Sequence, residues 1–175
     1  MDLKQLVAES KKGNIESFMF LLSAKQEMLY KIAYTYTQHP QDAEDVLSEA
    51  AIRAFDKIGQ LREPEKFYPW YTALLINLCR AHYHRKRKER AGPAYDPQAA
   101  WEPAVPDCSA AVEDRVLAEQ ILRSLPYPER ELLVLKFMED FTLKEIAEIM
   151  DMAEGTVKSR LYRALKKIKQ VWGDA

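Results

Sequence analysis

The chain has 175 residues, enough for one compact domain or two small ones. Its 26 Lys and Arg against 27 Asp and Glu give a net charge of -1, so a nucleic-acid-binding surface must be local. The sequence has neither an apolar run of the roughly 18 residues that a membrane span needs nor a signal-peptide pattern. Two cysteines without a CxxC motif exclude a zinc knuckle and a disulfide scaffold. We therefore expect a cytoplasmic protein that does not insert into membranes.

Apolar residues recur every three or four positions, which predicts an all-α fold. In the predicted helix 41–58 one face is apolar and the other is acidic. The apolar face holds Ala43, Leu47, Ala50, Ala54 and Ile58. On the other side, an acidic stripe consists of Asp42, Asp45, Glu49 and Asp56. Such an acidic stripe is most often just a solvated face, and that interpretation stays open at this point.

The predicted helix 66–90 begins with aromatic residues and ends in a basic run. Its periodicity places His82 with the apolar face, as a core or boundary residue, and Asn77, Arg80 and His84 on the opposite face. Aromatic rings beside a basic helix suit unpaired bases, because rings stack on bases while Lys and Arg hold phosphates. The alternative is that the aromatic cluster belongs to the core.

Residues 91–114 contain no Lys or Arg, five acidic residues and four prolines. This composition favours an extended connection. We therefore predict two small helical domains, residues 1–91 and 111–175, joined by a flexible, acidic, proline-rich linker at residues 92–110.

The last part of the chain has the pattern of a helix-turn-helix. Thr142 and Glu145 form a predicted capping box at the start of a helix that runs to about Met150. After a short turn, a second helix begins near Glu154, and its outer face is strongly basic. Its predicted inner face holds Val157, Leu161, Ala164, Leu165 and Ile168. A basic second helix is typical of DNA recognition; the alternative is a solvated amphipathic helix.

The sequence contains no motif for catalysis, a cofactor or a metal ion: it has no glycine-rich phosphate loop, no HExxH and no GxSxG. We therefore expect no enzymatic activity and neither a cofactor nor a metal ion. A metal-dependent nuclease that uses Asp42, Asp45 and Glu49 is the weakest alternative.

Several motifs occur in a characteristic order and spacing over about residues 5–170. They are Asp42-Ala43-Glu44-Asp45-Val46 followed by Glu49, Pro69-Trp70 with Asn77 and the basic run, Leu125-Pro126 with Glu129-Arg130, Glu145-Ile146-Ala147, and Glu154-Gly155-Thr156-Val157-Lys158-Ser159-Arg160-Leu161. Together they resemble the extracytoplasmic-function (ECF) sigma factors of bacterial RNA polymerase.

The resemblance implies two helical domains, sigma region 2 and sigma region 4. In region 2, the predicted helix 41–58 would dock on the clamp helices of the largest polymerase subunit. The aromatic and basic helix 66–90 would melt and capture the minus-ten promoter element. The implied docking residues are Asp42, Glu44, Asp45 and Glu49. The implied minus-ten residues are Phe67, Trp70, Asn77, Arg80, His84, Arg85 and Arg87.

Region 4 would read the minus-thirty-five element in the major groove with its second helix and contact the flap of the second-largest subunit. Ser159, Tyr162 and Arg163 would meet base edges. The full set implied is Thr156, Lys158, Ser159, Arg160, Tyr162, Arg163, Lys166 and Lys167. Core RNA polymerase, promoter DNA and an anti-sigma factor are thus the expected partners. A stand-alone helix-turn-helix regulator is the main alternative, although it leaves the acidic stripe and the first basic segment without a role.

Overall fold

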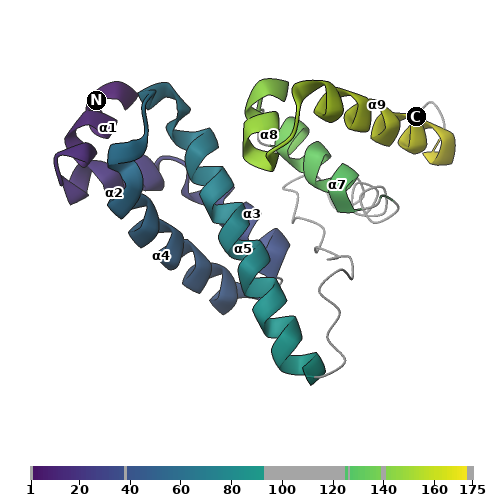
Figure 1. Cartoon of the computed structure of the whole chain (residues 1–175), viewed down its shortest axis with the longest axis horizontal. Helices are drawn as coiled ribbons and strands as arrows, with labels where there is room; N and C mark the ends of the chain where they lie inside the picture. Colours follow the sequence, from purple (N-terminus) through teal and green to yellow (C-terminus); the bar gives the residue numbers. More distant parts are fainter. Residues whose placement is uncertain (1, 38, 93–124, 126, 139–140, 173–175) are drawn as a thin grey trace. The chain divides into compact units, whose positions relative to one another are not determined.

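The computed structural model describes residues 2–37, 39–92, 125, 127–138 and 141–172 (Figure 1). Every regular element in these ranges is a helix, which confirms the predicted all-α fold. Contacts divide the chain into two compact units, Met1–Ala99 and Ala100–Ala175. The predicted linker lies outside the described residues from position 93 onward, so its character and the domain boundaries stay predictions. Within the described ranges, no helix has both the length and the apolar character that a membrane crossing requires.

The first unit is a bundle of helices whose ends are set by local sequence. Gly13 follows the first helix with a φ of 92°, a conformation that glycine adopts without strain. The Asn14 side chain then accepts a hydrogen bond from the Ser17 amide at 3.0 Å and caps the second helix. Pro40 occupies the first turn of the fourth helix, where its missing N–H is not needed. The helices are α1 (Leu3–Lys11), α2 (Ile15–Ser23), α3 (Gln26–Thr37), α4 (Pro40–Lys57) and α5 (Phe67–Ala91), with short 3-10 turns at Ile58–Gln60 and Pro64–Lys66.

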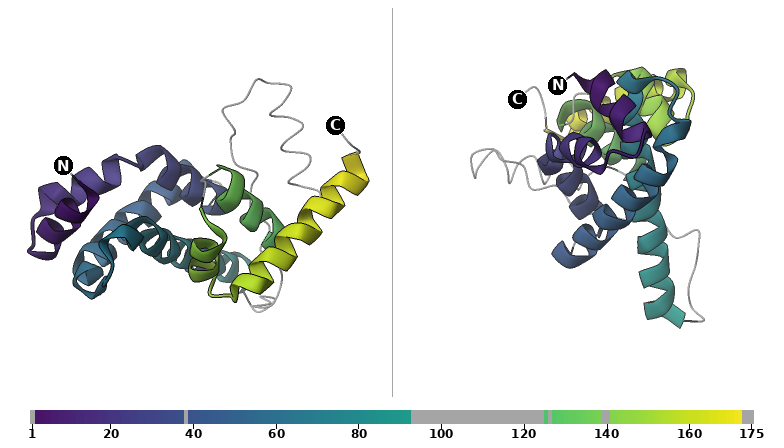
Figure 2. Two further views of the ribbon diagram at one scale, coloured as in Figure 1. Left: turned by 90° about the horizontal axis from the view of Figure 1, so that it is seen from above. Right: turned by 90° about the vertical axis from the view of Figure 1, so that its left-hand side faces the viewer.

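Helices α3, α4 and α5 pack against one another. The buried face of α4 is lined with small residues, and Ala43, Ala50 and Ala54 have no exposed surface. Phe18 of α2 makes edge contacts with Phe55 of α4 at 5.2 Å and with Phe67 of α5 at 6.2 Å between ring centroids. These rings join three helices at one end of the bundle. At the other end, the last part of α5 continues beyond the start of α4 (Figures 1 and 2).

The second unit contains the predicted helix-turn-helix. Its elements are α7 (Tyr127–Leu133), a π-helical turn at Val134–Met138, α8 (Leu143–Met150) and α9 (Glu154–Trp172). The capping box at Thr142 and Glu145 is present, as predicted. Between α8 and α9, Asp151 adopts the left-handed conformation, and the Met152 amide donates to the Ala147 carbonyl at 2.9 Å. This pattern is a Schellman ending of α8.

The inner face of α9 differs from the prediction at one residue. Val157 and Ala164 are fully buried, and Leu161 and Ile168 pack partly buried against the core. Leu165, predicted to be on this face, is 41% exposed. It follows Ala164 by one residue and therefore lies about 100° further around the helix.

Candidate nucleic-acid interface

One exposed face of α4 is acidic with an apolar residue among the carboxylates. Asp45 and Asp56 are exposed, and Glu49 forms an ion pair with Arg53 one turn further along the helix. Ile52 lies between them and is 66% exposed. The spacing of three and four residues places the four side chains on one side of the helix. We call Asp45, Glu49, Ile52 and Asp56 the acidic face. Ile52 was not among the predicted docking residues, although its distance of three residues from Glu49 and four from Asp56 places it on the same side of the helix.

The other two predicted docking residues lie elsewhere on α4. Glu44 is exposed, but it precedes Asp45 by one residue and so lies about 100° away around the helix. Asp42 is directed at α5: its Oδ2 atom is 3.4 Å from His82 Nε2, and its Oδ1 atom is 3.3 Å from Lys86 Nζ. Only 20% of the Asp42 side chain is exposed. The structure therefore does not bring the four predicted carboxylates together.

The electrostatics of Asp42 follow from this position. Partial burial acts to raise the pKa of its carboxyl group, because burial disfavours the charged form. The contacts with His82 and Lys86 favour the charged form and together outweigh burial, so the pKa lies below its ordinary value. Asp42 is thus an ionised residue between two helices.

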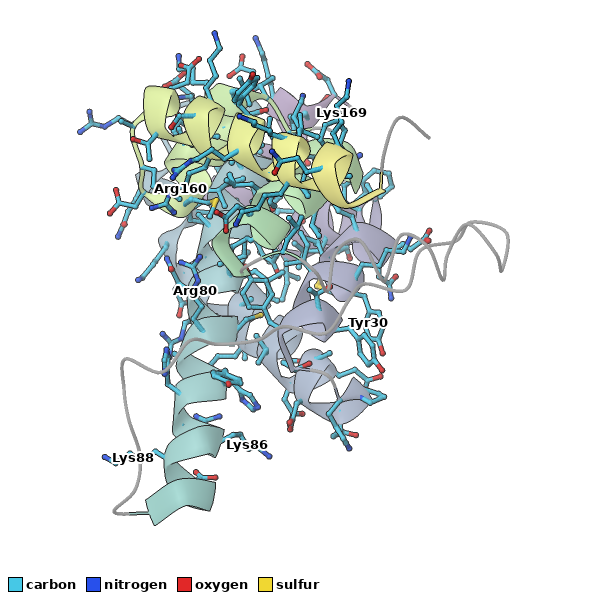
Figure 3. The ribbon with its side chains drawn as sticks, turned by 90° about the vertical axis from the view of Figure 1, so that its right-hand side faces the viewer. Tyr30, Arg80, Lys86, Lys88, Arg160 and Lys169 are labelled. Atoms are coloured by element: carbon cyan, nitrogen blue, oxygen red, sulfur yellow. The ribbon has the colours of Figure 1, made fainter. Side chains whose placement is uncertain are left out.

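A stripe of polar residues follows one face of α5. Asn77 and Lys88 are exposed, and Arg80 and His84 are half-buried. Steps of three or four residues align these four side chains along the helix. Figure 3 shows Arg80 and Lys88 on one side of α5 and Lys86 on the other. Lys88 was not among the predicted minus-ten residues, although its spacing from His84 and Arg80 could have shown that it belongs with them.

The aromatic start of α5 divides into core and surface. Phe67 has no exposed surface, and its ring lies 6.1 Å from that of Trp70 and 6.0 Å from that of Tyr71. A base could stack on Phe67 only if the ring left the core, where it faces Phe18 of α2. The minus-ten contact of Phe67 stays a prediction. Trp70 is partly exposed and remains accessible to a base.

The remaining residues of the basic run have mixed positions. His82 is 8% exposed, as predicted for a core or boundary residue. Arg85 is exposed, and its guanidinium group lies 3.0 Å from His82 Nδ1. A guanidinium group can only donate hydrogen bonds, so Nδ1 is the acceptor and neutral His82 carries its proton on Nε2, the atom that faces Asp42. The side chain of Arg87 lies outside the described residues.

All eight predicted minus-thirty-five residues lie on α9. Thr156 and Arg160 are half-buried, and the other six are exposed. Tyr162 is 70% exposed, unusually open for an aromatic residue. The Ser159 hydroxyl donates to the Thr156 carbonyl at 3.0 Å, which directs its lone pairs away from the backbone. The helix therefore presents basic and hydrogen-bonding groups on a face that the described residues of this unit leave uncovered.

No group of His, Cys, Asp and Glu side chains in the described ranges is arranged to hold a metal ion. Asp42 is turned toward α5 while Asp45 is exposed, so these carboxylates share no coordination point. The nuclease alternative thus finds no site in this part of the chain.

The chain is similar to known protein families and to known proteins over most of its length. The family model described as Sigma-70 region 2 matches residues 21–89, and the one described as Sigma-70, region 4 matches residues 115–168. The chain is 28% identical to the ECF RNA polymerase sigma factor SigW of Bacillus subtilis (strain 168), over 97% of this chain and 96% of that protein. It is 26% identical to the ECF RNA polymerase sigma factor SigM of Mycobacterium tuberculosis, over 97% of this chain and 84% of that protein.

Two solved structures share the fold. One is CnrH in complex with the cytosolic domain of CnrY, with a TM-score of 0.70 and 20% identity over 99% of this chain and 100% of that one. The other is the sigma factor RpoE in complex with the anti-sigma factor NepR from Bartonella quintana, with a TM-score of 0.64 and 20% identity over 89% of this chain and 96% of that one. With both sigma regions matched in order along the chain, the protein belongs to the ECF sigma factors, the initiation factors that direct bacterial RNA polymerase to promoters.

Proposed function

We propose that this sigma factor divides its tasks among three helices: α4 binds core RNA polymerase, α5 binds the minus-ten element and α9 reads the minus-thirty-five element. The observation that carries this proposal is the separation of charge. The net charge is -1, yet the acidic face lies on α4 while basic side chains gather on α5 and α9. Opposite charges kept on separate helices suit a protein that binds a basic protein surface and DNA at the same time.

The partner of the acidic face is the pair of clamp helices of the largest polymerase subunit. Asp45 and Glu49 supply complementary charge, which orients the encounter and raises its rate more than it adds affinity. Ile52, two-thirds exposed among these carboxylates, supplies apolar contact area that is buried on docking.

The minus-ten element is bound in melted form along α5. Trp70 offers a partly exposed ring on which an unstacked base can pack, and Asn77 offers hydrogen bonds to a base edge. Arg80, His84 and Lys88 continue the same face and hold the phosphates of the opened strand.

The minus-thirty-five element is read by α9 in the major groove. Ser159, Tyr162 and Arg163 meet base edges. Phosphates are held by Lys158, Arg160, Lys166 and Lys167. This unit also contacts the flap of the second-largest subunit, and an anti-sigma factor controls the protein by covering its binding surfaces. Because polymerase and promoters are cytoplasmic, the protein acts there, by binding alone and without catalysing a reaction of its own.

The stand-alone regulator accounts for α9 but leaves the acidic face and the basic part of α5 unused. A charge reversal at both Asp45 and Glu49 to Lys separates the two interpretations. It should weaken binding to core polymerase by about tenfold or more, because repulsion replaces attraction at the docking face. The matched control reverses both Glu16 and Glu44 to Lys, which makes the same change in net charge at two exposed positions that lie away from this face. Normal core binding by the Asp45 and Glu49 variant in a titration at fixed salt would rule out docking through this face.

A further inference from the structure

The first turn of α4 and the basic half of α5 are joined by a short chain of polar contacts. Asp42 faces His82 Nε2 at 3.4 Å and Lys86 Nζ at 3.3 Å. On its other side, the His82 ring accepts from Arg85 at 3.0 Å. The 3.4 Å separation is long for a hydrogen bond, and His82 Nε2 has no other partner in the described part of the chain. Asp42 is thus the negative charge that this buried imidazole N–H meets.

These contacts lie where α5 leaves the rest of its unit. The views of Figures 1 and 2 both show the last part of α5 continuing beyond the start of α4. Asp42 stands in the first turn of α4 and touches α5 at residues 82 and 86, close to this point. It is therefore placed to set the direction in which the projecting part of α5 points.

The side of α5 that Asp42 touches differs from the side proposed to bind DNA. Lys86 points away from the side that carries Arg80 and Lys88 (Figure 3). A carboxylate on the opposite side of the helix can affect DNA binding only through the position of α5 or through its charge. The two effects have opposite signs, because removal of a negative charge near DNA favours binding, whereas loss of a brace disfavours it.

We propose that Asp42 is a positioning residue for minus-ten binding: it braces α5 through His82 and Lys86 and makes no contact with polymerase. This inference rests on the proposed minus-ten function of α5. It assigns to α4 two separate tasks, polymerase docking on its exposed acidic face and support of α5 at its first turn. The difference between Asp42 and Asp45 is therefore one of role as well as of exposure.

The test uses the full-length chain with the isosteric substitution Asp42→Asn. The affinity for core polymerase should stay within about twofold of the parent. Holoenzyme formed at saturating core should then bind a fork-junction DNA with a single-stranded minus-ten element about five- to tenfold more weakly, measured by fluorescence anisotropy. Glu16→Gln is the control, since Glu16 is an exposed acid in the first turn of α2 and its removal changes the net charge equally.

Each other outcome contradicts the proposal. Unchanged or tighter DNA binding by Asp42→Asn would mean that the brace does not matter, and a loss of core affinity would return Asp42 to the docking face. Lys88→Ala, at an exposed position on the side of α5 proposed to bind DNA, tests the minus-ten function separately. If Lys88→Ala weakens DNA binding while Asp42→Asn leaves it unchanged, the brace fails and the minus-ten function of α5 stands; if neither variant weakens it, the minus-ten function of α5 fails as well. The parent protein supplies a measurement that does not depend on a variant: ¹⁵N NMR of His82 in its neutral form should show the proton on Nε2. A proton on Nδ1 would overturn the order of contacts from Asp42 through His82 to Arg85.

Discussion

Thr142 and Glu145 satisfy each other's backbone amides at the start of α8. The Glu145 amide donates to the Thr142 hydroxyl at 3.2 Å, and the Glu145 carboxylate accepts from the Thr142 amide at 2.8 Å. Two amides that have no partner within the helix are thereby paired. Because α8 packs against α9, the same pair also helps to hold α9 in place.

Replacement of Thr142 by Val removes the hydroxyl while keeping the branched shape. The start of α8 should lose about 1 kcal/mol of stability, so the Glu145 amide should exchange its hydrogen roughly fivefold faster. Native-state hydrogen exchange measures this directly. Thr142→Ser keeps the hydroxyl and should exchange like the parent. Equal acceleration in both variants would contradict the role of the cap, because Ser still offers the capping hydroxyl.

The backbone of Asp151, in the turn between α8 and α9, is strained because its φ of 52° lies in the left-handed region. Asp151→Gly should stabilise the second unit by about 0.5 to 1 kcal/mol, because glycine adopts this conformation without strain. Asp151→Asn is the control for charge, since Asn also tolerates the left-handed region. Urea unfolding followed by circular dichroism measures both. If the Gly variant were no more stable than the Asn variant, backbone strain would not be the cause.

Arg163 and Lys166 are both exposed on α9 but are expected to contribute differently. Arg163→Ala should reduce the binding free energy for the minus-thirty-five element by about 1 to 3 kcal/mol and relax specificity at one position of that element. Lys166→Ala should weaken binding to all DNA sequences alike. It should also reduce, by about one, the slope of the logarithm of the binding constant against the logarithm of the salt concentration. Binding titrations with matched and mismatched duplexes at several salt concentrations distinguish the two effects. Equal losses on both duplexes for Arg163→Ala would make it a phosphate contact.

Asp42 should contribute to acid sensitivity of the first unit. Its pKa is lowered in the folded protein, so the stability it contributes is fully present above its ordinary pKa of about 4 and is lost as pH falls through the lower folded value. The difference in unfolding free energy between the parent and Asp42→Asn should therefore be constant near neutral pH and shrink below about pH 4. Urea titrations across this range measure it. A difference that grew on acidification would contradict an ionised Asp42 that is stabilised by its contacts with His82 and Lys86.

Much of the fold and of the α9 surface could be predicted because the signals are local. The Thr142 and Glu145 box, the start of α9 at Glu154 and the buried stripe through Val157 and Ala164 depend on residues three or four positions apart. Helix periodicity and capping act over such distances, so the pattern in the chain is nearly sufficient. The exposure of the α9 basic residues follows from the same periodicity.

The roles of particular residues on α4 and α5 depended on the tertiary structure. Periodicity grouped Asp42 with Asp45 and Glu49, whereas packing of α4 on α5 turned Asp42 toward His82 and Lys86. In the sequence, Phe67 is one of several aromatic residues beside a basic run. Its contact with Phe18 of α2, a residue distant in the chain, places it in the core. The acidic, basic and apolar faces follow from the chain alone, because they depend on side-chain chemistry and helical spacing. Which members of each face remain available to a partner follows from packing, because burial and pairing depend on residues brought together from distant segments.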